Sequence, residues 1–175
     1  TTILGFADLL TSPNLSHEER RDFLETITRN VRFLLALITD ILDLSKIEAE
    51  KMSIEFVDCS LRQLVDDVLG VVRVRAQVKG LSLEVAYDSS LPETIRTDPT
   101  RLRQILVNLA GNAIKFTDRG GVHISIWSGE PRQGSAQVRF AISDTGVGID
   151  PAKLGELFQP FTQADASTTR RFGGT

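Results

Sequence analysis

The fold is decided by the stretch QILVNLAGNAIKFT, which occupies residues 104–117. It lies in a longer helical pattern from Pro99 to Phe116, with Asp98 placed to cap the start and Pro99 in the first turn. The predicted apolar face consists of Leu102, Ile105, Leu106, Leu109 and Ala113. Asparagine is a weak helix former, so two asparagines one turn apart in an apolar stretch require a reason.

A second face of this helix carries groups suited to a charged ligand. Its residues follow at steps of four, four and three, which aligns Gln104, Asn108, Asn112 and Lys115. Amide oxygens are hard ligands that suit Mg²⁺, and Lys115 adds a positive charge nearby. These groups suit a metal-bound polyphosphate, but the pattern alone leaves a solvated polar helix face equally open.

A glycine-containing turn, DTGVGI at residues 144–149, directly follows a predicted strand. A carboxylate at a strand end, here Asp144, can accept a hydrogen bond from an adenine amino group. Gly146 and Gly148 would let the backbone approach a flat ligand closely. The alternative is an ordinary tight turn, which also uses Asp and Gly.

The C-terminal residues have the pattern of a lid. An aromatic pair in FQPF, residues 158–161, precedes a polar stretch from Thr162 to Arg171 and then Gly173 and Gly174. Long loops between fixed points often close over ligands. Arg170 and Arg171 lie where they could meet phosphates, although at least one of them is expected to be ordinary solvated charge.

Residues 1–48 have the pattern of a helical hairpin. Ser16 and Glu19 form an S-x-x-E capping box that opens the second helix. The broad apolar face of that helix includes Phe23, Ile27, Val31, Leu34, Ile38, Ile41 and Leu42. One short partner helix cannot cover this face, so we expect a homodimeric four-helix bundle. An intramolecular bundle with the downstream region is the less favoured alternative.

Strands and helices alternate in the remaining residues. Strand-like alternation occurs at residues 53–57, 81–85, 122–126 and 137–142, and a helical pattern spans Leu61 to Val78. Residues 129–135 are rich in Gly, Pro and Ser and are predicted to be a loop. We therefore expect an α+β fold with helices on one face of a mixed sheet.

Composition excludes several classes of protein. The net charge is −3 with both signs interspersed, which argues against a nucleic-acid-binding surface. No apolar run is long enough to cross a bilayer, and no signal peptide opens the chain. The single cysteine, Cys59, excludes an intrachain disulfide and fits a cytoplasmic location. Whether a larger protein would be anchored in a membrane stays open.

These motifs, in this order, resemble those of sensor histidine kinases of two-component systems. Residues 104–117 look like the N box, 144–148 the first glycine box, 158–161 the F box, and 173–175 the start of the second glycine box. The stretch ILDLSKIEA, residues 41–49, looks like the end of the family's dimerisation hairpin. Single blocks are weak signals, but together they cover essentially the whole chain.

The resemblance implies the fold, the ligands and the residue roles. It implies a hairpin domain over residues 1–50, followed over 51–175 by a Bergerat-type α/β sandwich that binds ATP. Asn108 would bind Mg²⁺, Asn112 and Lys115 would face the phosphates, and Asp144 would recognise adenine. Gly146 and Gly148 would shape the pocket, and Gly173 and Gly174 would begin the closing turn of the lid. The γ-phosphoryl group of ATP would pass to a histidine and then to an aspartate of a response regulator.

Neither histidine of this sequence is expected to accept the phosphoryl group. In the family the acceptor lies in an H-E-x-R-T-P-L motif, which would fall just before Thr1, and we expect a chain cut at both ends. His17 begins H-E-x-R but lacks the Thr-Pro that should follow, and it falls on a capping turn. His123 lies in a strand pattern, where a structural role is expected.

The sequence is compatible with two other functions. The same fold could bind nucleotide in a pseudokinase or scaffold that does not autophosphorylate. A chaperone- or topoisomerase-type ATPase is a third possibility, but the hairpin ending in residues 43–49 argues against it. We expect the isolated chain to be inactive in autophosphorylation.

Overall fold

The computed structural model describes residues 2–12, 15–132, 135–153 and 155. The chain divides into two compact units, Thr1–Ile54 and Glu55–Thr175. We call them the hairpin unit and the sheet unit and describe each by itself. Within the described residues, no helix is both long enough and apolar enough to cross a lipid bilayer.

The hairpin unit contains helix α1 (Thr2–Leu9) and helix α2 (His17–Glu48). The predicted capping box at the start of α2 is confirmed. The backbone N–H of Glu19 donates to Ser16 Oγ over 3.2 Å, and the backbone N–H of Ser16 donates to Glu19 Oε2 over 2.9 Å. Contact between the two helices includes Phe6 and Phe23, whose ring centroids lie 5.2 Å apart.

Much of the apolar face of α2 remains exposed in the single chain. Among the described residues of this unit, no hydrophobic side chain is buried. Exposed large apolar residues on α2 include Val31, Leu34, Ile38, Ile41 and Leu42. The hairpin therefore leaves open the face that the sequence pattern predicted to need a partner.

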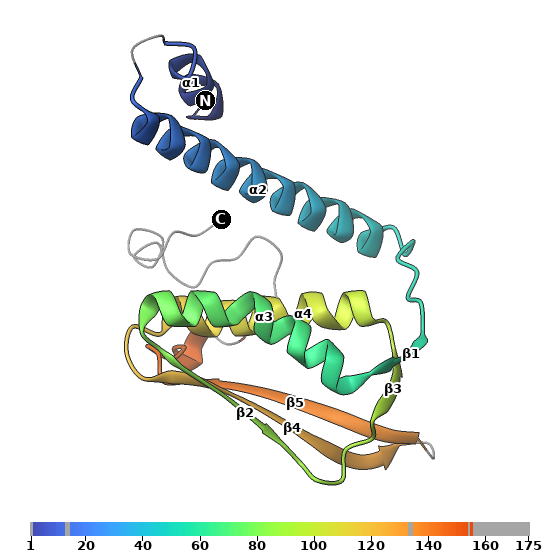
Figure 1. The fold of residues 1–175 in the computed structure, drawn as a ribbon. Helices are drawn as coiled ribbons and strands as arrows, with labels where there is room; N and C mark the ends of the chain where they lie inside the picture. The colour runs from blue at the N-terminus through green and yellow to red at the C-terminus, as the bar shows by residue number, and fades with distance from the viewer. Residues whose placement is uncertain (1, 13–14, 133–134, 154, 156–175) are drawn as a thin grey trace. The chain divides into compact units, whose positions relative to one another are not determined.

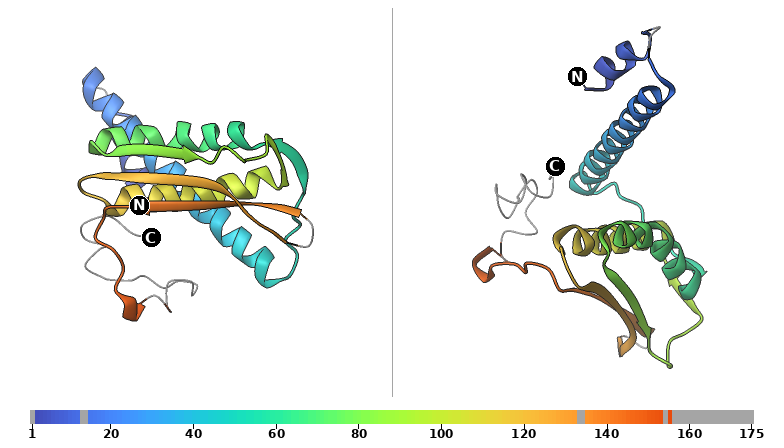
Figure 2. Two further views of the ribbon diagram at one scale, coloured as in Figure 1. Left: turned by 90° about the horizontal axis from the view of Figure 1, so that it is seen from below. Right: turned by 60° about the vertical axis from the view of Figure 1, so that its left-hand side comes forward.

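The sheet unit is an α+β structure with a mixed sheet, which confirms the predicted fold class. Its three-stranded sheet has the order β2–β4–β5, formed by Ser82–Tyr87, Gly121–Arg132 and Ser135–Asp144. Strand β2 runs parallel to β4, and β4 runs antiparallel to β5. Helices α3 (Leu61–Lys79) and α4 (Pro99–Phe116) lie together on one face of this sheet (Figures 1 and 2).

The core of the sheet unit lies between the helices and the sheet. On β4, Val122, Ile124 and Ile126 are buried, while the residues between them lie on the other face of the sheet. The helices contribute buried residues to the same core, including Leu61, Val65, Leu69, Val72, Ala76, Ala110, Ala113 and Ile114. This packing fixes α4 against the sheet, and hence fixes which of its side chains face outward.

Both helices of this unit begin with a side-chain cap. Ser60 Oγ accepts the backbone N–H of Gln63 at the start of α3, over 3.3 Å. The predicted cap of α4 is confirmed, since Asp98 Oδ1 accepts the backbone N–H of Arg101 over 3.0 Å and Pro99 follows it. Asp98 Oδ2 also accepts the backbone N–H of Glu55, and these bonds, the one from Arg101 first, lower the pKa of the Asp98 carboxyl below its usual value.

The structure differs from the sequence prediction at three places. The first strand, β1, spans Val57–Ser60 rather than residues 53–57, and it pairs with β3 (Thr94–Thr97), which was not predicted. The predicted loop at 129–135 is shorter, because β4 continues to Arg132 with a register shift after Gly129. A short 3₁₀ helix at Pro151–Lys153 follows β5.

Candidate functional site

The polar residues predicted on α4 lie on its outward side. Gln104, Asn108 and Asn112 are exposed, Lys115 is partly buried, and the four span an arc of about 80° at 3.6 residues per turn. The opposite side of the helix is buried through Leu106, Ala110 and Ala113. Both asparagine amides are therefore available to a ligand, as a metal or phosphate site would require.

Two apolar residues of α4 border this polar arc. The sequence prediction placed Ile105 and Leu109 on the apolar face of this helix, and in the structure their exposed fractions are 54% and 50%. At 100° per residue, both lie beside Asn112 on the helix surface. They are exposed because the apolar stripe is wider than the part that the sheet covers. The polar arc of α4 therefore lies next to exposed apolar side chains. A ligand that has both an anionic and an apolar part could contact both.

Asp144 is the last residue of β5 and lies at the edge of the helix-covered face. It is the register partner of Val122, which is buried beneath the helices. Its Oδ1 accepts the backbone N–H of Gly146 over 2.8 Å, which fixes the direction of the carboxylate. The side chain itself is exposed and can accept further hydrogen bonds.

The turn after Asp144 lies against the C-terminal end of α4. The backbone N–H of Val147 donates to the carbonyl of Phe116 over 3.4 Å. A Cβ at Gly146 would lie 2.5 Å from that carbonyl oxygen, so only glycine permits this approach. Gly148 has a φ of +69°, a left-handed conformation that also favours glycine. The two predicted motifs, far apart in sequence, therefore meet at Phe116.

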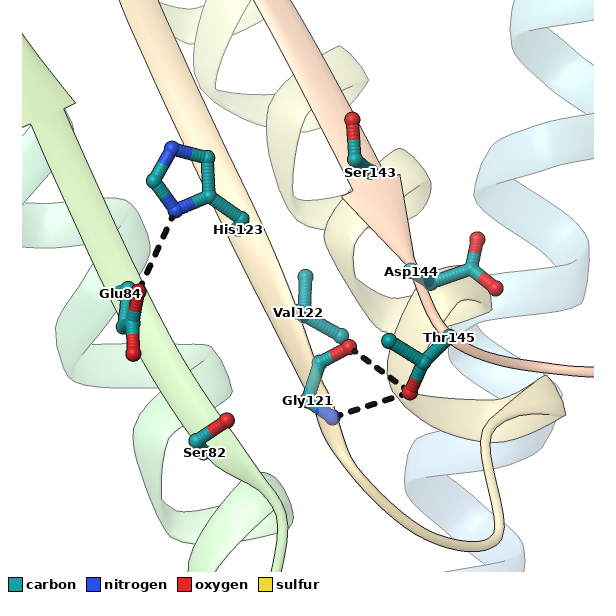
Figure 3. Close-up of a pocket in the computed structure, with 8 residues that line it drawn as sticks. All are labelled: Ser82, Glu84, Gly121, Val122, His123, Ser143, Asp144 and Thr145. Atoms are coloured by element: carbon teal, nitrogen blue, oxygen red, sulfur yellow. Dashed lines mark hydrogen bonds and ion pairs between the residues drawn. The ribbon is translucent and has the colours of Figure 1, made fainter.

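Thr145 anchors the same turn to the loop that follows α4. Its Oγ1 donates to the carbonyl of Arg119 over 2.9 Å and accepts the backbone N–H of Gly121 over 3.1 Å. Its backbone N–H donates to the carbonyl of Gly121 over 3.2 Å. Figure 3 shows Thr145 next to Gly121, at the start of β4. These bonds could not be predicted from local sequence, because they join residues more than twenty positions apart.

A shallow hollow of about 210 Å³ lies mainly on the uncovered face of the sheet. In it, His123 Nδ1 lies 3.5 Å from Glu84 Oε2, across the parallel strands β4 and β2 (Figure 3). His123 therefore has an acidic neighbour that sequence alone did not reveal. Asp144 also borders the hollow, but its carboxylate points away from Glu84 and His123 in Figure 3. The candidate site residues on α4 therefore lie apart from Glu84 and His123 in this hollow.

Several predicted features lie outside the described residues. They are residues 158–161, the stretch 162–171, Gly173 and Gly174. His17 is described, and it is exposed as the first residue of α2. Within the described part of the chain, no cluster of three or more His, Cys, Asp or Glu side chains could hold a metal ion.

Two protein families match this sequence. Residues 1–50 match the family described as "His Kinase A (phospho-acceptor) domain". Residues 97–175 match the family described as "Histidine kinase-, DNA gyrase B-, and HSP90-like ATPase". The boundaries of the first match fall within the hairpin unit and those of the second within the sheet unit.

Curated relatives and a solved structure agree with these matches. The chain is 41% identical over 173 residues to the signal transduction histidine-protein kinase BarA of Escherichia coli, covering 99% of the chain and 19% of BarA. It is 40% identical over 173 residues to the sensor histidine kinase GacS of Pseudomonas protegens, covering 99% of the chain and 19% of GacS. A crystal structure of full-length ShkA in complex with AMPPNP is similar with a TM-score of 0.73 and 33% identity, covering 96% of this chain and 35% of ShkA. The chain thus spans about a fifth of the length of the two curated relatives.

Proposed function

Because the chain belongs to the sensor histidine kinases, with a dimerisation region followed by an ATP-binding domain, we propose that it catalyses ATP-dependent phosphorylation of a histidine. The γ-phosphoryl group would then pass to an aspartate of a response regulator. The observation that carries the proposal is the meeting of the Asp144 turn with the end of α4 at Phe116. It brings a candidate adenine acceptor to the helix that carries candidate phosphate and metal ligands.

The arrangement suits an elongated nucleotide. Asp144 would accept the adenine amino group, and Gly146 and Gly148 would let the backbone lie close to the base. From Phe116 back to Asn108 the helix covers about 12 Å at 1.5 Å per residue. The base would therefore lie near the Asp144 turn, and the phosphates would extend along the face that carries Lys115, Asn112 and Asn108.

The residues of this chain would act by positioning and by neutralising charge. Asn108 would help to hold a Mg²⁺ ion through its amide oxygen, since hard oxygen ligands suit that ion, and the ion would supply positive charge to offset that of the phosphates. Lys115 and Asn112 would donate to phosphate oxygens. Phosphoryl transfer needs little covalent participation by the protein, so holding the γ-phosphate in line with the attacking histidine is the main requirement. Gly173 and Gly174, by family resemblance, would begin the turn that closes the lid.

The hairpin unit would bring the acceptor to the nucleotide through dimerisation. The exposed apolar residues of α2 support pairing with a second copy in a four-helix bundle. A bundle of this kind would present an acceptor histidine and a docking surface for a response regulator. The curated relatives are named as histidine kinases, so the pseudokinase alternative is not favoured.

The first experiment is autophosphorylation of the full-length protein with labelled ATP, comparing wild type with Asp144→Asn. Wild type should acquire an acid-labile, base-stable label, which is the signature of phosphohistidine. Asp144→Asn removes a charged acceptor worth about 1.5–3 kcal/mol, so nucleotide affinity should fall by about 10- to 150-fold while the dimer stays intact. Unchanged affinity in a fluorescent-nucleotide titration would refute the adenine role. Nucleotide binding without any label would favour a pseudokinase.

The metal assignment is tested separately with Asn108→Ala. We expect nucleotide affinity to fall by about tenfold with Mg²⁺ present and to change little in EDTA, because only the metal-dependent part of binding is lost. Gln77→Ala, at an exposed position of α3 outside the proposed site, is the control. An equal loss with and without Mg²⁺ would show that Asn108 does not act through the metal.

A further inference from the structure

The two helices of the sheet unit end in different ways. Helix α3 ends at Gly80, whose φ of +67° gives the left-handed glycine cap common at helix ends. Helix α4 ends at Thr117, which is extended, with a φ of −103° and a ψ of 122°. The last carbonyls of a helix lack partners within the helix, so the end of α4 needs another source of donors.

Lys79, the last residue of α3, supplies these donors. Its Nζ donates to the carbonyls of Ile114 over 2.9 Å, Lys115 over 2.7 Å and Thr117 over 3.1 Å. An ammonium group has three N–H donors, and three carbonyls lie within reach. A positive charge at a helix C-terminus is also favoured by the helix dipole.

The neighbouring carbonyls of the same turn have other partners. Thr117 Oγ1 donates to the carbonyl of Ala113 over 2.7 Å, and Thr117 is fully buried. The carbonyl of Phe116 accepts the backbone N–H of Val147, in the turn after Asp144. Lys79 and the Asp144 turn therefore hold adjacent carbonyls of one helical turn. That turn carries Lys115, the candidate phosphate ligand.

We propose that Lys79 is a positioning residue for nucleotide binding. It holds the last turn of α4 in place, and so fixes the backbone that presents Lys115 and the carbonyl against which Gly146 and Val147 lie. Its effect on the nucleotide is indirect, through the backbone of α4. The inference rests on the proposed function only in naming the ligand; the effect of Lys79 on the Asp144 turn can be measured without nucleotide.

The test compares Lys79→Met with Arg73→Met in the full-length protein. Methionine keeps an unbranched side chain but removes the donors and the charge. Arg73 is an exposed cation on the same helix, so its variant controls for loss of charge from α3. Hydrogen exchange is measured on the nucleotide-free proteins, and ATP affinity is measured by titration well below the melting temperature, where all variants are folded.

Exchange at residues 117–121 and 144–148 should be faster in Lys79→Met than in wild type or Arg73→Met. The dissociation constant for ATP should rise by about fivefold in Lys79→Met and stay within about twofold of wild type in Arg73→Met and in Lys79→Arg, whose guanidinium can also donate to terminal carbonyls. Lys79→Gln, which keeps two donors, serves in the same assays if Lys79→Met does not fold.

Three outcomes would overturn the inference or its premise. A lower melting temperature with wild-type exchange at 144–148 and wild-type ATP affinity would make Lys79 a purely stabilising residue. Equal effects of Arg73→Met and Lys79→Met would show that general charge, not the three carbonyl contacts, matters. Failure of wild type to bind ATP would refute the proposed function, while the exchange comparison would still decide whether Lys79 holds the Asp144 turn.

Discussion

Helices α2 and α3 carry similar apolar stripes but differ in what covers them. On α3, Val72 has no exposed surface, because α4 and the sheet pack over it. On α2, Ile38 lies at the centre of the stripe and is 45% exposed. An apolar helical face thus shows that a helix needs a partner, but it does not show whether the same chain provides one.

The difference has an energetic meaning. Complete burial of an aliphatic side chain contributes about 1.5–3 kcal/mol, and the sheet unit obtains this contribution within one chain. In the hairpin unit most of the apolar face of α2 stays exposed, so much of this burial free energy is not gained within one chain. We therefore expect a second surface to bind to that face. The two units should therefore respond differently to mutation: one by unfolding and the other by dissociation.

The largest effect is expected from Val72→Asp. A charge placed in the core without a partner should cost more than about 4 kcal/mol and unfold the sheet unit. Val78→Asp, on the same helix at a position that is 84% exposed, is the matched control and should melt close to wild type. Circular dichroism during heating measures both. A cooperative wild-type-like melt of Val72→Asp would contradict the packing described here.

A smaller effect, on association, is expected from Ile38→Glu. Two charges would enter the proposed dimer contact, one from each copy, and the dimer dissociation constant should rise by about 100-fold or more. Nucleotide affinity should stay within about twofold of wild type. Arg29→Glu, on the opposite side of α2, controls for added negative charge. Sedimentation measures the dimer constant, and a dimer that is equally tight in Ile38→Glu would show that α2 does not pair through this stripe.

The smallest effect is expected within the sheet unit, at the cap of α4. The pKa of Asp98 is lowered in the folded protein, so its contribution to stability is present above the unfolded pKa and is lost as pH falls through the folded pKa. Wild-type stability should therefore decline as pH falls below about 4. Asp98→Asn keeps a capping oxygen but cannot titrate, so its melting temperature should fall less steeply there. Parallel curves for the two proteins would refute this role.

Features with local causes were predictable from the sequence. Asp98 and Pro99 define the start of α4, and Ser16 and Glu19 define the start of α2, because a cap depends on residues within one turn. The family motifs likewise carried the fold class. The start of β1 was misjudged because Ile54 and Phe56 alternate as in a strand, while the strand begins where pairing with β3 begins, at Val57 opposite Thr97.

Features that depend on distant contacts were not predictable. Nothing near Lys79 indicates that its ammonium meets the carbonyls of Ile114, Lys115 and Thr117. The exposure of Ile105 depends on how far the sheet extends beneath α4, which periodicity does not report. The neighbour of His123 follows only from the parallel register of β2 and β4, which places Glu84 beside it. The candidate site residues were thus identifiable by type, but the residues that hold them in place were not.

The bonds of Thr145 restrict how this protein can diverge. Gly120 has a φ of +98°, which side-chain-bearing residues rarely adopt, and a Cβ there would lie 2.2 Å from Thr145 Oγ1. Both the backbone conformation and the lack of space therefore exclude a larger residue at this position. An insertion or deletion within residues 117–121 would shift Arg119 and Gly121 away from Thr145 and so displace the turn that carries Asp144. We therefore expect homologues to keep this connection at constant length and to vary instead at the opposite end of the β4–β5 hairpin, where the register already shifts between Gly129 and Arg132.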